Sequence, residues 1–71
     1  MVVKVVFNEK PIELNYAGRS IKITQMGLHH KYYEGRALHH VFSVCSDSAY
    51  FRLNLNTESL TWILEETKPA L

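Results

Sequence analysis

Cysteine is nearly absent from this 71-residue chain, whose single thiol, Cys45, cannot form a disulfide within the chain. Small secreted domains usually carry several disulfides, because their cores are too small to be stable alone. No charge of one sign dominates either, since eight basic residues stand against seven acidic ones. Proteins that bind phosphate backbones usually carry a clear basic excess. The composition therefore predicts a reducing, cytoplasmic setting and gives no support to nucleic-acid binding.

Long hydrophobic runs are also missing from the sequence. The apolar stretches span only a few residues, far fewer than the roughly 20 that a membrane helix needs. The start at Met1 lacks the basic segment and long apolar region of a signal peptide, so we expect neither membrane insertion nor secretion. The hydrophobic fraction, 46%, is ordinary for a globular protein. The length allows one domain, predicted over residues 1–67 with a flexible tail at 68–71.

Alternating apolar and polar residues are the strongest pattern that the sequence does contain. A period of two is typical of half-buried strands, whose successive side chains point to opposite faces. Residues that favour turns separate the alternating segments. The predicted strands cover residues 2–7, 12–16, 21–24, 37–45, 50–55 and 60–65. We therefore expect a mainly β domain, an antiparallel meander of five to six strands that curls into a small barrel or roll.

The predicted layout resembles that of SH3-like small barrels over most of the chain. Curling protects the edges of a sheet, which would otherwise expose unpaired backbone groups. The resemblance concerns the arrangement of strands alone, and it implies no function.

Register tests the strand assignment, because a slip of one residue would move every side chain to the other face. Turns at 17–18, 46–49 and 56–59 place apolar residues opposite apolar residues. The predicted pairs are Leu14–Ile21, Ile12–Ile23, Val44–Phe51, Phe42–Leu53, His40–Leu55, Leu55–Leu60, Leu53–Trp62 and Phe51–Leu64. The predicted core comprises Ile21, Ile23, Phe42, Val44, Phe51, Leu53 and Trp62.

The C-terminal segment allows a second interpretation. Leu60, Ile63 and Leu64 also fit one face of a helix, which Thr57 would cap. A helix at about 58–67 would make the fold α+β. The β-forming residues around Trp62 favour a strand, and we retain the strand as the main prediction.

Four histidines are the candidates for metal ligation: His29, His30, His39 and His40. Neutral imidazole ligates zinc, copper and nickel, so His29, His30 and His39 together give an alternative, metal-binding hypothesis. Neighbouring residues on a strand face opposite sides, however, and spacing signatures such as HExxH and CxxC are absent. The main expectation is no metal and no cofactor, with His40 at the edge of the core and His29 and His30 in an exposed loop.

No catalytic constellation emerges from the remaining residues. Cys45 is predicted beside Tyr50 at a turn, without a neighbouring histidine to generate the thiolate. The three glycines lie too far apart to form a phosphate-binding loop. We therefore expect that the protein is not an enzyme.

The segment 27–36 is predicted as the longest loop, and long loops in compact domains are often functional. Its aromatic, histidine and basic side chains can make directional contacts, and Arg52 could extend the surface they form. The predicted binding residues are His29, His30, Lys31, Tyr32, Tyr33, Arg36 and Arg52. We expect a non-catalytic protein-interaction module, with a nucleic-acid-binding barrel as the alternative. The strand at 2–7 is predicted as a sheet edge, through which two copies could pair as a homodimer.

Overall fold

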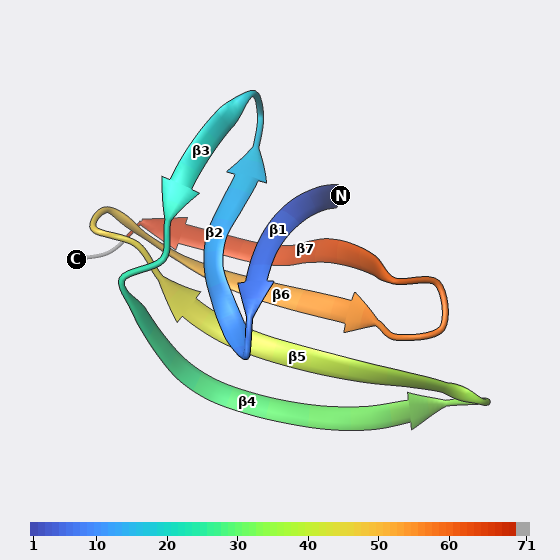
Figure 1. Ribbon diagram of the computed structural model, residues 1–71. Coiled ribbons are helices and arrows are strands. Elements are labelled where there is room, and N and C mark those ends of the chain that lie inside the picture. Colours follow the sequence, from blue (N-terminus) through green and yellow to red (C-terminus); the bar gives the residue numbers. More distant parts are fainter. Residues whose placement is uncertain (70–71) are drawn as a thin grey trace.

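The computed structural model describes residues 1–69, and all of its strands belong to one antiparallel sheet (Figure 1). The strands are β1 (Val2–Asn8), β2 (Lys10–Tyr16), β3 (Arg19–Lys22), β4 (Gln25–Glu34), β5 (Ala37–Cys45), β6 (Ala49–Asn56) and β7 (Thr61–Pro69). Their order across the sheet is β3-β2-β1-β7-β6-β5-β4. The predicted antiparallel, mainly β fold is confirmed. Within residues 1–69 the strands number seven, where five to six were predicted.

Tight turns with left-handed residues join several of the strands. Ala17 and Gly18 both have positive φ, 52° and 74°, as a two-residue type I′ hairpin requires. Gly35 has a φ of 62° at the first of the two residues between β4 and β5, where a type II′ turn favours glycine. These short turns keep β2 beside β3 and β4 beside β5, whereas β3 and β4, although consecutive, form the two edges of the sheet.

The sheet curls into a half-barrel, with β1 to β3 lying across one face of β4 to β7 (Figure 1). We call that covered side the inner face and the opposite side of β4 to β7 the outer face. The core between the two parts contains Val3, Leu14, Phe42, Val44, Phe51, Leu53 and Leu64. Ile21, Ile23 and Trp62 are partly buried against it. The predicted core is therefore confirmed, with four of its members buried and three at its margin.

Register agrees with the prediction in two hairpins. Phe42 lies opposite Leu53 between β5 and β6, with Val44–Phe51 and His40–Leu55 on either side. Leu14 lies opposite Ile21 between β2 and β3, and the Ile23 amide donates to the Ile12 carbonyl at 3.1 Å.

The predicted register of the last hairpin is wrong. Leu55 lies opposite Trp62 and Leu53 opposite Leu64, two residues away from the predicted pairs, and Phe51 faces Thr67 beyond a β-bulge. The cause is the turn, which covers residues 57–60 and has Leu60 in a left-handed conformation with φ 55°. A shift of two residues keeps each side chain on its face. Trp62 and Leu64 were therefore assigned to the inner face correctly although their partners were not, whereas Leu60, predicted on the same face, is exposed in the turn.

Four further expectations require correction. The segment predicted as a loop at 27–36 forms most of β4 and the turn after it. The alternative helix at 58–67 is wrong, because β7 occupies most of that segment and continues through Pro69. Residues 68 and 69, assigned to the tail by the sequence, are therefore strand residues, and residues 70 and 71 lie outside the described residues. Strand β1 is internal, since it pairs with both β2 and β7. A homodimer through β1, as predicted, would therefore have no free strand edge to pair with.

Candidate functional site

An aromatic cluster crosses the inner face of the sheet from β1 to β4. The Phe7 ring lies 5.9 Å from both Phe42 and Trp62, and His29 stacks on Phe42 at 4.3 Å with an angle of 8°. His40 stacks next to His29 at 5.1 Å. We call these five residues the aromatic face. Although Phe42 is buried, Phe7 is 46% exposed and His29 is exposed, so the cluster is open to a partner.

The aromatic face is open because β1 to β3 cover only part of the longer strands. In Figure 1 the ends of β4 and β5 that meet at their turn extend beyond β1. Tyr33 and Lys31 lie in that region, opposite Leu38 and His40 of β5. Strand β4 is also an edge of the sheet, and all ten of its residues are exposed.

His29 and His40 form a direct pair within the aromatic face. The His29 Nε2 and His40 Nδ1 atoms are 2.8 Å apart, so in the neutral state the N–H of one ring donates a hydrogen bond to the bare nitrogen of the other. Burial lowers the pKa of His40 below its ordinary value of 6.5, and the neighbouring charges of His29 and Lys31 lower it further. His40 therefore favours its uncharged form.

Stability is expected to fall as the solution is acidified, because His40 resists protonation in the folded state. Below pH 6.5 the unfolded chain binds a proton that folded His40 takes up only at lower pH, so the free energy of unfolding decreases. Urea unfolding between about pH 8 and pH 5 measures this slope, in the range where histidine titrates. A His40→Gln variant should have a shallower slope. His30→Gln, on the exposed outer side of β4, is the control and should keep it; equal slopes for wild type and His40→Gln would contradict the prediction.

The outer face carries a polar cluster, buried at His39 and Asn54, that the sequence did not predict. It contains Tyr32, His39, Asn54 and Glu65, which we call the polar cluster. His39 Nδ1 and Asn54 Oδ1 are 2.8 Å apart, and Asn54 Nδ2 donates to the Tyr32 hydroxyl and to Glu65 Oε2, each at 3.0 Å. The Tyr32 ring lies flat on His39, with centroids 4.8 Å apart and an angle of 4°. Stacking of Tyr32 thus helps to bury His39, which is only 9% exposed.

Hydrogen bonds in this cluster determine the tautomer of His39. A carboxylate only accepts, so Glu65 requires the amide nitrogen of Asn54 on its side. The Asn54 oxygen must then face His39, and the Nδ1 atom of His39 must carry the proton. In the neutral ring the Nε2 atom is left with a free lone pair. This buried atom has no hydrogen-bond partner among the described residues, and its closest carboxylate oxygen is Glu34 Oε1 at 4.0 Å.

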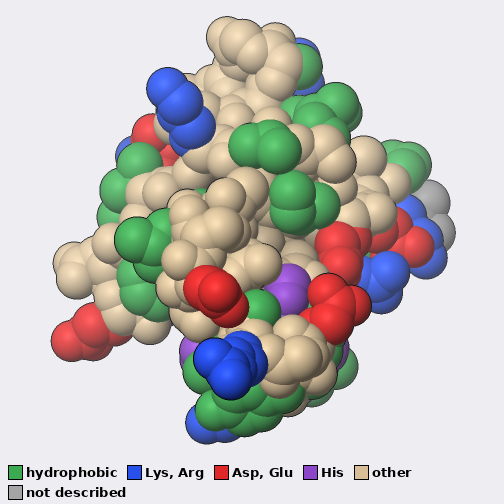
Figure 2. All heavy atoms as spheres, turned by 90° about the vertical axis from the view of Figure 1, so that its right-hand side faces the viewer, with side chains coloured by type: hydrophobic (Ala, Val, Ile, Leu, Met, Phe, Trp, Pro, Cys, Tyr) green, Lys and Arg blue, Asp and Glu red, His purple; other side chains and the backbone are tan. Residues whose placement is uncertain are grey.

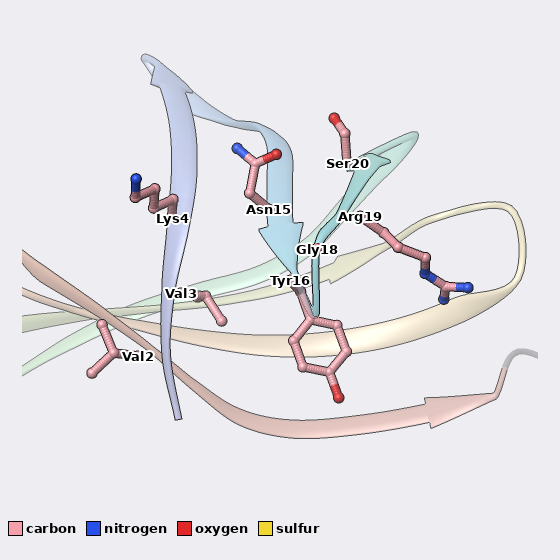
Figure 3. Close-up of a pocket in the computed structure, with 8 residues that line it drawn as sticks. All are labelled: Val2, Val3, Lys4, Asn15, Tyr16, Gly18, Arg19 and Ser20. Carbon is pink, nitrogen blue, oxygen red and sulfur yellow. The ribbon is translucent and has the colours of Figure 1, made fainter.

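Two hollows in the surface are lined by side chains that could bind a ligand. The larger, of about 680 Å³, is bordered by Lys4, Asn15, Tyr16 and Arg19, but Figure 3 shows the Lys4 and Arg19 side chains directed to opposite sides. Those two cations therefore do not converge on a common ligand. The smaller hollow, of about 260 Å³, lies on the outer face and includes His39, Asn54 and Glu65 of the polar cluster.

The structure divides the predicted binding residues between the two faces. On the inner side of β4 are His29, Lys31 and Tyr33, and on the outer side are His30 and Tyr32. Arg36 lies exposed in the turn. Arg52 lies opposite Ser43, as predicted, but its Nε atom is 3.3 Å from Glu65 Oε1 and its guanidinium also approaches Glu66. Arg52 is therefore engaged within the sheet and does not join the β4 side chains.

The histidines of the metal-binding hypothesis are not brought together. His29 stacks on Phe42 at the inner face, whereas His39 stacks on Tyr32 at the outer face. In the part of the chain that the structure describes, no three His, Cys, Asp or Glu side chains are grouped as metal ligands. Instead the short contact is between His29 and His40, a pair that strand alternation alone did not indicate.

Sequence reasoning missed Phe7, Asn54 and Glu65 as members of these clusters. Asn54 follows the same alternation as any solvated strand residue, and Phe7 stands next to a turn. Neither position carries a local signal, because their partners belong to strands distant in sequence.

Comparison with protein-family models, with curated proteins and with solved structures finds no match to this chain. Residues 1–69 include no helix with the length and apolar character needed to cross a membrane.

Proposed function

We propose that this protein is a non-catalytic interaction module that binds an extended segment of a partner protein along β4. The segment would add a strand to the sheet and lay alternate side chains on the aromatic face. The observation that carries the proposal is the position of the open aromatic face directly beside an exposed edge strand. Strand addition uses main-chain hydrogen bonds for affinity and side-chain pockets for specificity.

The backbone of β4 supports this mode of binding. Half of the amide and carbonyl groups of an edge strand point away from its neighbour and are free to pair. A register irregularity lies between Met26 and His29, after which His29 to Glu34 pair continuously with β5. The regular segment of six residues is the part of the edge to which a partner strand would pair.

The side chains beside this edge favour an apolar or aromatic partner residue. Phe7, His29 and Trp62 offer ring surface next to the buried Phe42, and aromatic pairs add about 0.5–1.5 kcal/mol beyond simple burial. Aromatic residues also dominate the energetics of protein interfaces. A protein segment with apolar side chains at alternate positions fits such a surface.

The charges favour a protein over a nucleic acid, the second candidate. Arg52 is paired with Glu65 and Glu66, which leaves Lys31 and Arg36 as the basic groups of the β4 region. A phosphate backbone requires several cations along its path, whereas the net charge here is +1. The reducing, cytoplasmic setting and the SH3-like layout belong to the same proposal, and the free thiol of Cys45 is compatible with that setting.

Selection of peptides from a random displayed library tests the proposal. We expect selected peptides to protect β4 amides from hydrogen exchange and to change the fluorescence of Trp62, the only tryptophan. His29→Ala should weaken their binding by about tenfold, the loss typical of an interface hot spot. His30→Ala removes the same side chain from the outer side of β4, away from the aromatic face, and is the comparison variant, expected to weaken binding less than His29→Ala does.

Three results would overturn the proposal. Protection of β3 in place of β4 would assign binding to the other edge of the sheet. Binding of single-stranded oligonucleotides that weakens steeply with salt would favour the nucleic-acid alternative. A dimer in light scattering whose formation protects β4 without any peptide would make a second copy of the chain the occupant.

A further inference from the structure

His39 lines the hollow on the outer face, and its ring carries a hydrogen-bond acceptor that nothing in residues 1–69 satisfies. His39 Nε2 is buried and unpartnered, and the tautomer set by Asn54 leaves it a lone pair to offer. A buried polar atom without a hydrogen-bond partner lowers the stability of the fold. A ligand that donates a hydrogen bond to this atom would recover that stability.

Carboxylates outnumber cations around this acceptor. Glu65 lines the hollow of about 260 Å³ together with Asn56 and Thr61 and is paired with Arg52, and no lysine or arginine is among the described residues that line the hollow itself. Glu34 Oε1 lies 4.0 Å from Nε2. Figure 2 shows a histidine side chain at the surface with acidic side chains on either side of it and basic side chains beside them. A cationic group with N–H donors suits these surroundings, whereas an anion does not.

We propose that His39 and Glu34 bind the guanidinium or ammonium group of an arginine or lysine side chain in the partner segment. Two acceptors 4.0 Å apart can share one donor nitrogen at ordinary charge-assisted distances of about 2.7–2.9 Å. The Glu34 side chain is 81% exposed, so it can turn aside to admit the donor and then close on it. The Tyr32 ring, stacked on His39, adds an aromatic surface that attracts cations.

This inference rests on the proposed strand addition at β4 and specifies its chemistry. Tyr32 and Glu34 belong to the outer side of the edge strand, opposite the side of His29. Successive residues of an added strand alternate between the faces. The preferred segment therefore carries apolar residues toward the aromatic face and a basic residue toward the outer face.

Titration with methylguanidinium, followed by NMR of the His39 ring, tests the cation site without any peptide. The measurement is made near pH 8, above the usual titration range of histidine. We expect saturable shifts at His39, and about tenfold weaker binding for Glu34→Gln, because a hydrogen bond to a charged group contributes about 1.5–3 kcal/mol. Glu58→Gln removes an exposed carboxylate from the β6–β7 turn and should bind as wild type does. Tetramethylammonium carries the charge without N–H donors and should shift His39 far less than methylguanidinium does.

Equal affinity of wild type and Glu34→Gln for methylguanidinium would overturn the assignment, as would equal shifts with tetramethylammonium. The two proposals fail separately. If selected peptides protect β4 but lack basic residues and methylguanidinium does not bind, the cation site is wrong and strand addition stands. If methylguanidinium binds at His39 and no peptide protects β4, the cation site exists and the proposed function is wrong.

Discussion

Replacing Phe51 with alanine is expected to lower the free energy of unfolding by about 3–5 kcal/mol, the range measured for buried aromatic truncations. Phe51 is 3% exposed and lies opposite Val44. Its ring packs on the Tyr16 ring in an edge-to-face arrangement, with the two centroids 6.5 Å apart. It therefore joins the two parts of the half-barrel. A domain of this size is stable by only about 5 kcal/mol, so Phe51→Ala should be largely unfolded at room temperature. Urea unfolding followed by Trp62 fluorescence and far-UV circular dichroism measures the loss.

Two variants make this expectation testable even where Phe51→Ala does not fold. Phe51→Leu keeps most of the volume and should cost about 1 kcal/mol, as conservative core substitutions do. Tyr33→Ala removes an aromatic ring of which 71% is exposed and should leave stability almost unchanged. If Phe51→Leu unfolded at the same urea concentration as wild type, Phe51 would not occupy the core.

Replacing Asn54 with alanine is expected to destabilise the protein by about 2–3 kcal/mol, because buried polar groups lose their partners. The His39 Nδ1 proton and the Tyr32 hydroxyl would each lose a hydrogen bond, and Glu65 would lose a donor. The change should also release the His39 tautomer, since no amide oxygen would then hold the proton on Nδ1. Urea unfolding measures the first effect, and the nitrogen chemical shifts of the His39 ring measure the second.

Asn15 on β2 provides the matched control for Asn54, since it is an exposed asparagine on a strand. Asn15→Ala should change the free energy of unfolding by less than about 0.5 kcal/mol, as surface substitutions usually do. Asn54→Ala with wild-type stability and an unchanged His39 tautomer would contradict the hydrogen-bond network described here.

The sequence by itself determined the strands whose two faces differ. Leu38, His40, Phe42 and Val44 alternate with residues of the other face, and β5 was predicted with the bounds it has. The turns before β3 and β6 were also predictable from local residues, and so was the register of those hairpins. Local chemistry is sufficient there, because a half-buried strand must place its apolar residues on one side and the turn then fixes the pairing.

Strand β4 and the clusters beside it were decided only by the tertiary structure. Every residue of β4 is exposed, so its sequence has no apolar face to reveal a strand, and pairing with β5 establishes it. The turn that ends at Leu60 shifts the register of β7 by two residues from the predicted one. His39 and Asn54 became buried partners because the sheet aligns β5 with β6 and places Tyr32 over them. Contacts between distant segments form when the chain curls, and a pattern read along one segment does not contain them.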